Sequence, residues 1–329
     1  MPERKISSLS KKNRIFSFLA DENYVIFLLL APAVLLLLVE IIVPLVYSFV
    51  LSLEHARIHV VAGHGQVSGR FVGLGNYTYL LTDPSFWRAL RNTTYFTSVS
   101  LLIEFTVGIG MGVLLNQPFW GQRMVRILVF IPWAVPTVVN ARLWQWIYNG
   151  NSYGALNALL LQTHLLSAPK VWLNIVPVFP KIPIFGPFLA AIGSTQGMNA
   201  IIVADEWKTL PIVAILVLAG LQNIPQSYYE AARLDGATSF AQFRHITLPL
   251  LAPVLTVVAV LRVMQLFRAF TIFYTMVGHG LNMLSMKVYL TAFNFNAFGR
   301  GSALAFIMGF IVLLAALGFI KLFYREELQ

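Results

Sequence analysis

Cysteine is absent from the sequence, and charged residues are scarce. Charged side chains make up 11% of the 329 residues, whereas a soluble domain carries about 25%. The lack of cysteine excludes disulfide bonds and thiolate metal sites. The scarcity of charge, together with a hydrophobic content of 58%, indicates an integral membrane protein rather than a soluble one.

Motifs of the common enzyme classes are missing as well. The sequence has no Gly-rich phosphate loop followed by Lys-Ser/Thr, no His-Glu-x-x-His metal pair and no nucleophile elbow. His55, His59 and His64 share one polar segment, but no carboxylate cluster lies beside them. We therefore interpret that segment as a solvated loop rather than a metal site. We expect no catalytic residue, metal or cofactor in this chain.

The chain has a net charge of +10. Its basic residues are scattered rather than clustered, which argues against nucleic-acid binding. Several of them lie just beyond the ends of apolar segments, as the positive-inside rule describes for cytoplasmic loops. Arg123 and Arg126 mark one such loop, and Arg233 and Arg244 mark another.

The apolar segments each approach the roughly 20 residues that a bilayer requires. They comprise residues 24–53, 93–115, 127–148, 198–221, 250–277 and 302–323. The expected fold is an all-α integral membrane protein with six transmembrane helices and both termini in the cytoplasm. We divide the chain into a cytoplasmic tail (1–23), a first helix with an external loop (24–92), a core (93–323) and a second cytoplasmic tail (324–329).

A few ionisable residues fall inside these segments, where burial in lipid is expensive. Glu104 lies in the middle of the second segment, and Arg262 and Arg268 lie in the fifth. Two interpretations of Glu104 stay open: a carboxyl group satisfied by a neighbouring helix, or a functional group. Pro132 and Pro136 break the third segment, which is tolerated where helices pack or line a wet cavity.

One polar stretch separates the fourth and fifth segments. Residues 230–249 read EAARLDGATSFAQFRHITLP. Ala231 and Ala232 allow a partner surface to approach a short helix closely, and Gly236 permits a turn into a second short helix. Pro249 starts the next span. These properties indicate a docking surface on the cytoplasmic side.

The spacing within this stretch is Glu-Ala-Ala, three residues, Gly, nine residues, Ile-x-Leu-Pro. It is met by Glu230, Ala231, Ala232, Gly236, Ile246, Leu248 and Pro249. It resembles the coupling motif of the permease subunits of binding-protein-dependent ABC importers. The segments GLGNYTYLLTDPSFWRALRNT, IPWAVPTVV and WKTLPIVAILVLAGLQNIPQSYYEAARLDGA resemble the carbohydrate branch of that family, in particular the maltose-type permease subunit.

The resemblance implies a type I importer architecture with a permease core and a coupling loop at residues 223–249. In that family the loop sits in a cleft of a cytoplasmic ATPase subunit, with Glu230 as the main charged contact. The implied coupling residues are Glu230, Ala231, Ala232, Arg233, Asp235 and Gly236. ATP and Mg would be bound by that separate ATPase subunit, so the chain itself would not be an enzyme.

The resemblance also implies partners and a location. We expect a second permease subunit, two ATPase subunits, an extracytoplasmic binding protein, a sugar substrate and membrane lipid, but no nucleic acid. The chain would span the inner (plasma) membrane several times. We place the Pro-rich stretch 167–197 on the outer side of the membrane, and the sequence does not indicate its role.

A substrate pathway at mid-membrane is implied in the same way. Matching positions fall near Trp207 and Thr209 and along the fifth segment, where Arg262, Gln265 or Leu266, and Ala269 share one helical face. The expected pathway residues are Trp207, Thr209, Arg262, Gln265, Leu266, Ala269, Trp133 and Asn140. For each Trp, an interfacial anchor is the alternative interpretation.

The leading functional hypothesis is an ATP-driven importer of oligosaccharides of the maltose or trehalose type. Arg262 and Arg268 leave open an importer of a phosphorylated or acidic molecule such as glycerol phosphate. A different class, an ion-coupled carrier that uses Glu104, is the second alternative.

Overall fold

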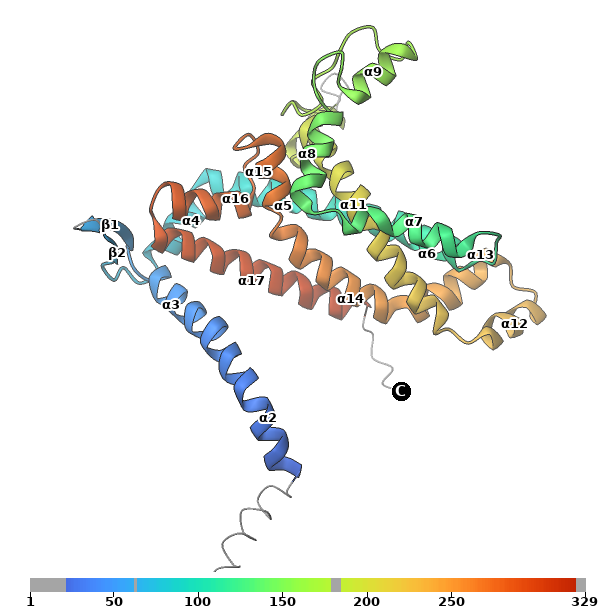
Figure 1. The fold of residues 1–329 in the computed structure, drawn as a ribbon, viewed down its shortest axis with the longest axis horizontal. Helices are drawn as coiled ribbons and strands as arrows, with labels where there is room; N and C mark the ends of the chain where they lie inside the picture. The colour runs from blue at the N-terminus through green and yellow to red at the C-terminus, as the bar shows by residue number, and fades with distance from the viewer. Residues whose placement is uncertain (1–21, 62–63, 179–184, 324–329) are drawn as a thin grey trace, which may run out of the picture.

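The computed structural model describes residues 22–61, 64–178 and 185–323. Within these ranges the chain is helical apart from one β-hairpin, so the predicted helical membrane fold is confirmed with a small exception. Long helices form an elongated body, with the hairpin at one end and two short helices at the other (Figure 1). Most of the two predicted tails, residues 1–21 and 324–329, lies outside the described ranges.

The first span is a helix in three parts: α2 (Glu22–Leu37), the π-helical turn η1 (Leu38–Ile42) and α3 (Val43–Ser52). Within Leu29–Ser52, 0% of the most apolar window is buried. The end of α3 packs on the last helix, where Phe49 meets Phe306 with 5.4 Å between ring centroids. The remainder leaves the body at a wide angle (Figure 1). Its apolar surface is therefore open to lipid or to another chain.

The polar segment after the first span is more ordered than the solvated loop that the sequence predicts. Strands β1 (Arg57–Val61) and β2 (His64–Ser68) form an antiparallel hairpin in which Arg57 pairs with Ser68. Helix α4 (Gly75–Thr82) follows it. The buried Asn76 amide donates to the backbone oxygens of Ser52 and Glu54, at 2.9 and 2.8 Å, and so fixes the base of the hairpin to α4.

The second span begins earlier than residue 93, where the apolar segment starts. It runs through α5 (Pro84–Ile103), η2 (Glu104–Gly108) and α6 (Ile109–Asn116). The Asp83 side chain accepts a hydrogen bond from Ser85 N at 2.8 Å, and Pro84 occupies the first helical position. This N-cap starts the helix within polar sequence.

The third segment is not one helix. It comprises α7 (Gln122–Ala134) and α8 (Thr137–Ile147), which meet at an angle of 93°. The break falls at Val135, whose ψ of 127° is extended. A residue that precedes a proline is driven out of the helical region, and here Pro136 follows.

The long segment that follows α8 contains two short helices, α9 (Ala155–Gln162) and α10 (Phe185–Ala191). Helix α9 stands away from the body (Figure 1). Asn157 is fully buried beneath the segment, and its amide donates to the backbone oxygens of Asn149, Asn151 and Lys170. Its oxygen accepts from Lys170 N and Trp172 Nε1. One side chain thus ties together residues that are distant in sequence.

Helix α11 (Gln196–Gln222) is central and packs against α6, α7 and α14 (Leu248–Phe267). Glycines on α6 and α11 permit close approach. A Cβ on Gly112 would lie 2.6 Å from Val217 Cγ1, and one on Gly220 would lie 2.8 Å from Leu251 Cδ2. The apolar core between these helices includes Ile109, Val213, Val217, Leu251, Leu255 and Val258.

The C-terminal part differs from the prediction of a fifth span over residues 250–277. Helix α14 ends at Phe267, and the short α15 (Thr271–Val277) folds separately. The predicted outer loop 278–301 contains α16 (Leu284–Tyr289), η4 (Leu290–Asn294) and the start of α17 (Phe298–Phe323). Apolar composition continues across the break at Arg268, so the sequence pattern did not show it.

In the described chain, four helices are long and apolar enough to cross a membrane, or five if the bent pair α7–α8 is one span. The predicted count of six is not confirmed by this criterion. Helix α11 has 27 residues, but it carries Asp205, Glu206 and Lys208. Whether α11 can be a further membrane span depends on whether these three charged side chains have partners inside the protein.

The α6–α11 contact gives a matched pair of substitutions. Gly112→Ala should lower the free energy of unfolding by about 1–3 kcal/mol, because the new methyl group overpacks against buried Val217. Gly110→Ala should be neutral or stabilising, since nothing lies within 4 Å of its Cβ position. Thermal unfolding of the purified protein in detergent measures both. Equal melting temperatures for the two variants would contradict the packing assignment.

The Asp83–Lys287 ion pair, with 2.8 Å between Oδ2 and Nζ, predicts acid sensitivity. Burial would raise the pKa of Asp83, but hydrogen bonds from Lys287 and Ser85 outweigh it and lower the pKa to about 2. The stabilisation is therefore present above the ordinary value of 3.8 and is lost as the pH falls through about 2. Asp83→Asn should flatten the dependence of melting temperature on pH in that window, whereas the exposed Asp235→Asn should not. A parent-like pH profile for Asp83→Asn would refute this.

Candidate functional site

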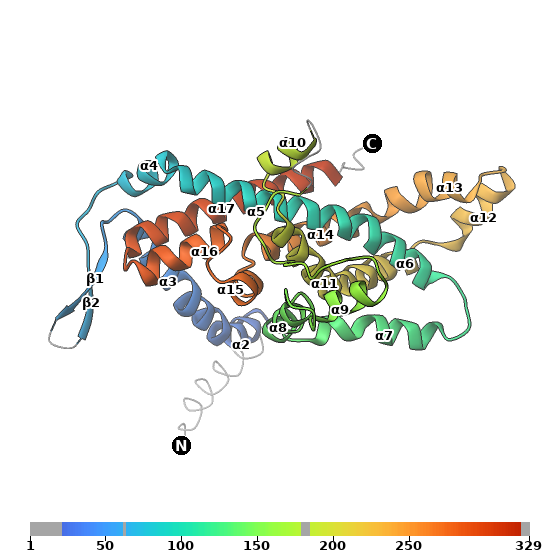
Figure 2. The same cartoon turned by 90° about the horizontal axis from the view of Figure 1, so that it is seen from above.

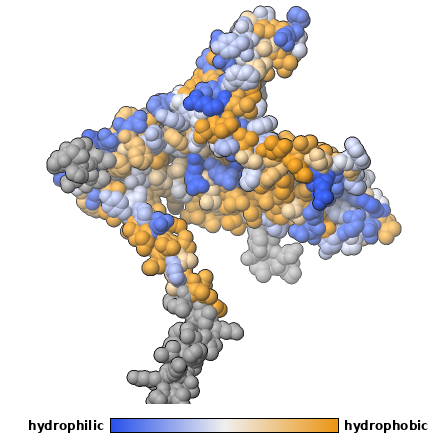
Figure 3. Space-filling view, in the orientation of Figure 1, coloured by the Kyte–Doolittle hydropathy of each residue, from blue (hydrophilic) through white to orange (hydrophobic). Residues whose placement is uncertain are grey.

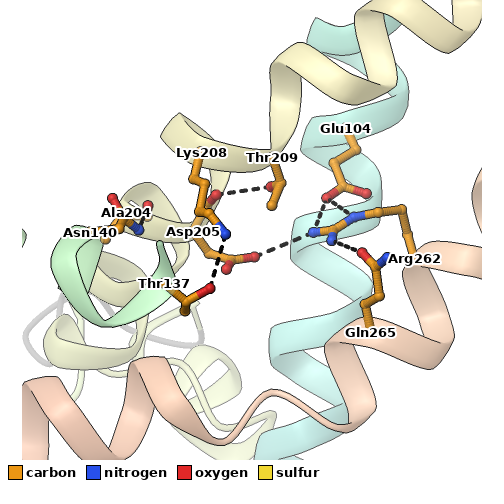
Figure 4. Close-up of polar contacts among 9 residues, drawn as sticks. All are labelled: Glu104, Thr137, Asn140, Ala204, Asp205, Lys208, Thr209, Arg262 and Gln265. Atoms are coloured by element: carbon orange, nitrogen blue, oxygen red, sulfur yellow. Dashed lines mark hydrogen bonds and ion pairs between the residues drawn. The ribbon is translucent and has the colours of Figure 1, made fainter. Parts of the chain in front are cut away.

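A buried ionic network joins three helices at the centre of the body. Arg262 on α14 is 6% exposed, and its Nε donates to Glu104 Oε1 at 2.6 Å. Its Nη2 lies 2.5 Å from the same oxygen and 3.3 Å from Asp205 Oδ2 on α11. Figure 4 shows the guanidinium between the two carboxylates. Pairing is required here, because removing either partner would leave an uncompensated buried charge.

Glu104 occupies the first position of η2 and is 0% exposed. A π-helical turn inserts one extra residue into a helix and changes the direction of the side chains that follow, and such turns are frequent at functional sites. Of the two interpretations of Glu104, the described contacts support the first for one oxygen: Oε1 is paired with Arg262 on a neighbouring helix, whereas the buried Oε2 has no hydrogen-bond partner among the described residues.

The network continues to an exposed amide. Arg262 Nη1 donates to Gln265 Oε1 at 2.6 Å (Figure 4). Because the oxygen of Gln265 is engaged, its NH₂ group is the part left to donate to other molecules. Glu104 therefore orients Arg262, and Arg262 orients Gln265.

Gln265 and Arg262 line a cavity of about 420 Å³. Figure 3 shows hydrophilic residues gathered in the middle of this face of the molecule, bordered by hydrophobic ones. Aliphatic side chains of α11 and α14 form much of the cavity wall, and polar and aromatic residues complete it: Trp133, Thr137, Asp205, Lys208, Thr209, Arg262, Gln265, Arg268, Phe270 and Thr271. A concave site with a few convergent polar groups is the usual form of a small-molecule site.

The opposite wall of the cavity is held by contacts between α8 and α11. Lys208 Nζ donates to Thr137 Oγ1 at 2.9 Å, and Thr209 Oγ1 donates to Asp205 O at 2.9 Å. Asn140 Nδ2 donates to Ala204 O at 3.0 Å (Figure 4). The bend between α7 and α8 lets α8 reach α11 at this level.

Most of the pathway residues expected from the sequence come together here. Those that line the cavity are Thr209, Arg262, Gln265, Leu266, Ala269 and Trp133. Asn140 does not, because it is fully buried and ties α8 to α11. Trp207 does not either; its ring lies 6.2 Å from that of Trp144. Asp205 and Lys208 also line the cavity. Asp205 lies four residues before Thr209 on the same helical face, which is a sequence signal, whereas Lys208 is adjacent to Thr209 and no such spacing identifies it.

The stretch that the sequence predicts as the coupling loop forms the far end of the body (Figure 2). It consists of α12 (Gln226–Leu234), α13 (Ser239–Gln242) and η3 (Phe243–Thr247). Gly236 between the two helices has a φ of +83°, which favours glycine. Thr238 Oγ1 accepts from Ala241 N at 3.3 Å and caps α13.

The side chains of this end are turned outward. Glu230, Ala231, Arg233, Asp235 and Gly236 are exposed, and Ala232 is half-buried. Leu234 and Phe240 are 89% and 72% exposed, which is unusual for large apolar residues at a helix end. Tyr229 OH lies 3.0 Å from Thr247 Oγ1 and joins α12 to η3. An exposed apolar tip on a braced helix pair has the form of a docking surface.

Comparison with known families decides the class. Residues 104–325 match the family described as "Binding-protein-dependent transport system inner membrane component". The chain belongs to this family. The matched region contains the ionic network, the cavity and the helix pair α12–α13, and it confirms the resemblance found in the motif at Glu230.

Relatives of this permease-family chain align over nearly all of it. It is 37% identical over 298 residues to the trehalose/maltose transport system permease protein MalF of Thermococcus litoralis, covering 90% of this chain and 92% of the relative. It is 32% identical over 318 residues to the sulfoquinovosyl glycerol transport system permease protein SmoG of Agrobacterium fabrum, covering 94% of each. These relatives confirm a permease of the carbohydrate ABC transport class.

A solved structure shows the same fold. A bacterial ABC transporter involved in the import of the acidic polysaccharide alginate contains a chain that matches with a TM-score of 0.74 and 19% identity. The match covers 95% of this permease-family chain and 99% of the other. Membrane-spanning helices and family membership together place the chain in a membrane, as predicted.

The ionic network predicts a non-additive pair of substitutions. Arg262→Met alone should lower the free energy of unfolding by about 3–5 kcal/mol, since it leaves the buried Glu104 without its cation. Glu104→Leu should cost less, because Arg262 keeps Asp205 as a partner at 3.3 Å. The double variant should recover the part of the Arg262→Met loss that comes from the unpaired Glu104. Thermal unfolding of the four proteins completes the cycle. Additive losses would show that the two side chains are not coupled.

Proposed function

We propose that this chain is one membrane subunit of an ATP-driven importer of neutral oligosaccharides of the maltose or trehalose type. The observation that carries the proposal is its 37% identity, over 90% of the chain, to a trehalose/maltose transport system permease protein. The trehalose transport system permease protein SugA of Mycobacterium tuberculosis, 29% identical over 304 residues, supports the same substrate class.

The cavity supports a hydroxyl-rich ligand. Arg262 is compensated by Glu104 and Asp205, so its donors and the amide of Gln265 are presented with little net charge. Thr209 adds a hydroxyl group and Trp133 an aromatic surface. Sugars combine hydroxyl groups with apolar ring faces, and these residues supply a partner for each.

One observation favours a second candidate, an acidic sugar. Arg268 lines the cavity and is exposed, and its Nε donates to the Met264 carbonyl at 3.3 Å rather than to a carboxylate. A relative named for sulfoquinovosyl glycerol transport is 32% identical to this chain. Arg268 would be the residue that distinguishes the two candidates.

The tip formed by α12 and α13 would couple transport to ATP hydrolysis. In this proposal the tip docks in a cleft of a separate cytoplasmic ATPase subunit, which binds ATP and Mg, with Glu230 as the main contact. The helix from Ser239 to Phe267 is continuous over 29 residues and carries both the tip and the cavity residues Arg262 and Gln265. A movement of the tip would therefore reach the cavity through a single rigid element.

The complete assembly would contain a second permease subunit, two ATPase subunits and an extracytoplasmic binding protein. A solved relative of the same fold was crystallised with a pentasaccharide-bound periplasmic protein, which supports a binding protein as partner. Both termini would lie in the cytoplasm, on the side of α12. An ion-coupled carrier is disfavoured, because Glu104 is fully buried and engaged by Arg262.

Glu230→Ala should reduce ATP-dependent uptake in the reconstituted complex by at least about tenfold while leaving the amount of permease in the membrane unchanged. Gly236→Pro should do the same, because proline cannot adopt the φ of +83° found there. Gln222→Ala, just before α12, is the control and should transport normally. Unaltered uptake of labelled maltose or trehalose by both test variants would remove the tip from the coupling mechanism.

A further inference from the structure

A row of aromatic rings extends away from the cavity. Phe270 stacks on Tyr274 with 5.3 Å between ring centroids and lies 4.9 Å from Tyr289. Tyr289 lies 5.4 Å from Phe293, which lies 5.7 Å from Phe298. These five residues come from four elements, α15, α16, η4 and α17, and from the turn before α15. We call them the aromatic row.

The row connects two defined places. Phe270 is one of the residues that line the cavity. Phe298, at the other end, is the first residue of α17, and its neighbour Gly299 donates to the Ala56 carbonyl at the base of the hairpin, at 3.2 Å. The hairpin and the tip of α12 and α13 lie at opposite ends of the body (Figures 1 and 2). The row thus runs from the cavity toward the end opposite the coupling tip.

Two rings of the row are exposed, whereas Phe270, Tyr289 and Phe298 are half-buried. Tyr274 is 45% exposed and Phe293 is 61% exposed. The adjacent Phe273 is fully buried, and it packs edge-on against Phe96 at 4.9 Å. Helix α15 therefore uses one face for the core and presents Tyr274 on the other.

The chemistry of the row suits a sugar. An aromatic face offers flat apolar area with a negative quadrupole, against which the polarised C–H groups of a pyranose ring can pack. Stacking of this kind tolerates variation in the ligand, as it does where nucleic-acid bases stack on aromatic platforms. The hydroxyl groups of Tyr274 and Tyr289 add hydrogen-bonding capacity along the row.

We propose that the aromatic row is a stacking path along which a sugar passes between the outer end of the chain and the polar cavity. The inference rests on the proposed function and extends it by naming a second binding region. Its continuity with the cavity through Phe270 argues for the sugar as occupant over a purely apolar partner surface. A sugar that moves along the row would leave one ring as it contacts the next, so its binding free energy would stay nearly constant.

The test uses the complete complex with its binding protein, reconstituted in vesicles that contain ATP. Phe293→Leu and Tyr289→Leu keep apolar bulk but remove the ring, and each should raise the KM for uptake of labelled maltose by about tenfold. Phe293→Tyr and Tyr289→Phe keep the ring and should transport like the parent. Phe295→Leu is the matched control, because Phe295 is 70% exposed and belongs to the same turn but is outside the row.

Uptake of a longer maltooligosaccharide distinguishes a binding role of the row from a purely structural one. This longer sugar can contact several rings at once, so the leucine variants should impair its uptake more than that of maltose. If both leucine variants have the KM of the parent, and the parent imports sugar, the proposal that the row is a sugar path is refuted. The proposed function of the chain is then unaffected. Loss of the second permease from the purified leucine variants would also refute the sugar path, by showing that the row is a subunit interface. A parent complex that imports no sugar with ATP would refute both proposals.

Discussion

The contact between Glu104 and Arg262 is the interaction on which the centre of this protein depends. Together with Asp205, this contact joins η2, α11 and α14 through one guanidinium, and the Glu104 and Arg262 side chains are almost completely buried. Buried ion pairs are seldom a net source of stability, because desolvation offsets most of the attraction. What this pair supplies is orientation. Two carboxylates fix the plane of the guanidinium, and its remaining nitrogen fixes the amide of Gln265 at the cavity wall.

Two long helices connect that cavity with the opposite tip. Helix α11 carries Asp205, Lys208 and Thr209 and leads within a few residues into α12. Helix α14 carries Arg262 and continues, through η3, from α13. The Tyr229–Thr247 contact closes the tip across these two connections. The cavity walls and the tip formed by α12 and α13 therefore belong to the same pair of helices, so a movement at the proposed coupling tip would reach the cavity walls through them.

Sequence patterns predicted the features that depend on local composition. Scarce charge indicated a membrane protein, the spacing from Glu230 to Pro249 indicated the coupling class, and the helical face of Arg262 and Gln265 indicated a cavity wall. Features that depend on tertiary partners were missed. The role of Asp205 follows only from the position of Arg262, which is 57 residues away in sequence. Likewise, α5 begins at Pro84 in polar sequence, before the apolar segment starts, and the helix break after Phe267 has apolar residues on both sides despite Gln265 and Arg268.

The charges of α11 have a consequence for biosynthesis. The first span carries a single acidic residue, Glu40, in its apolar part and needs no contact from the rest of the chain, so it can enter a bilayer as soon as it is made. Helix α11 differs, because a charged residue at the centre of a lone membrane helix costs roughly 2.5–3.5 kcal/mol. The ion pair between Asp205 and Arg262 forms only when Arg262, on a later helix, has been synthesised. We therefore expect α14 to favour the stable insertion of α11.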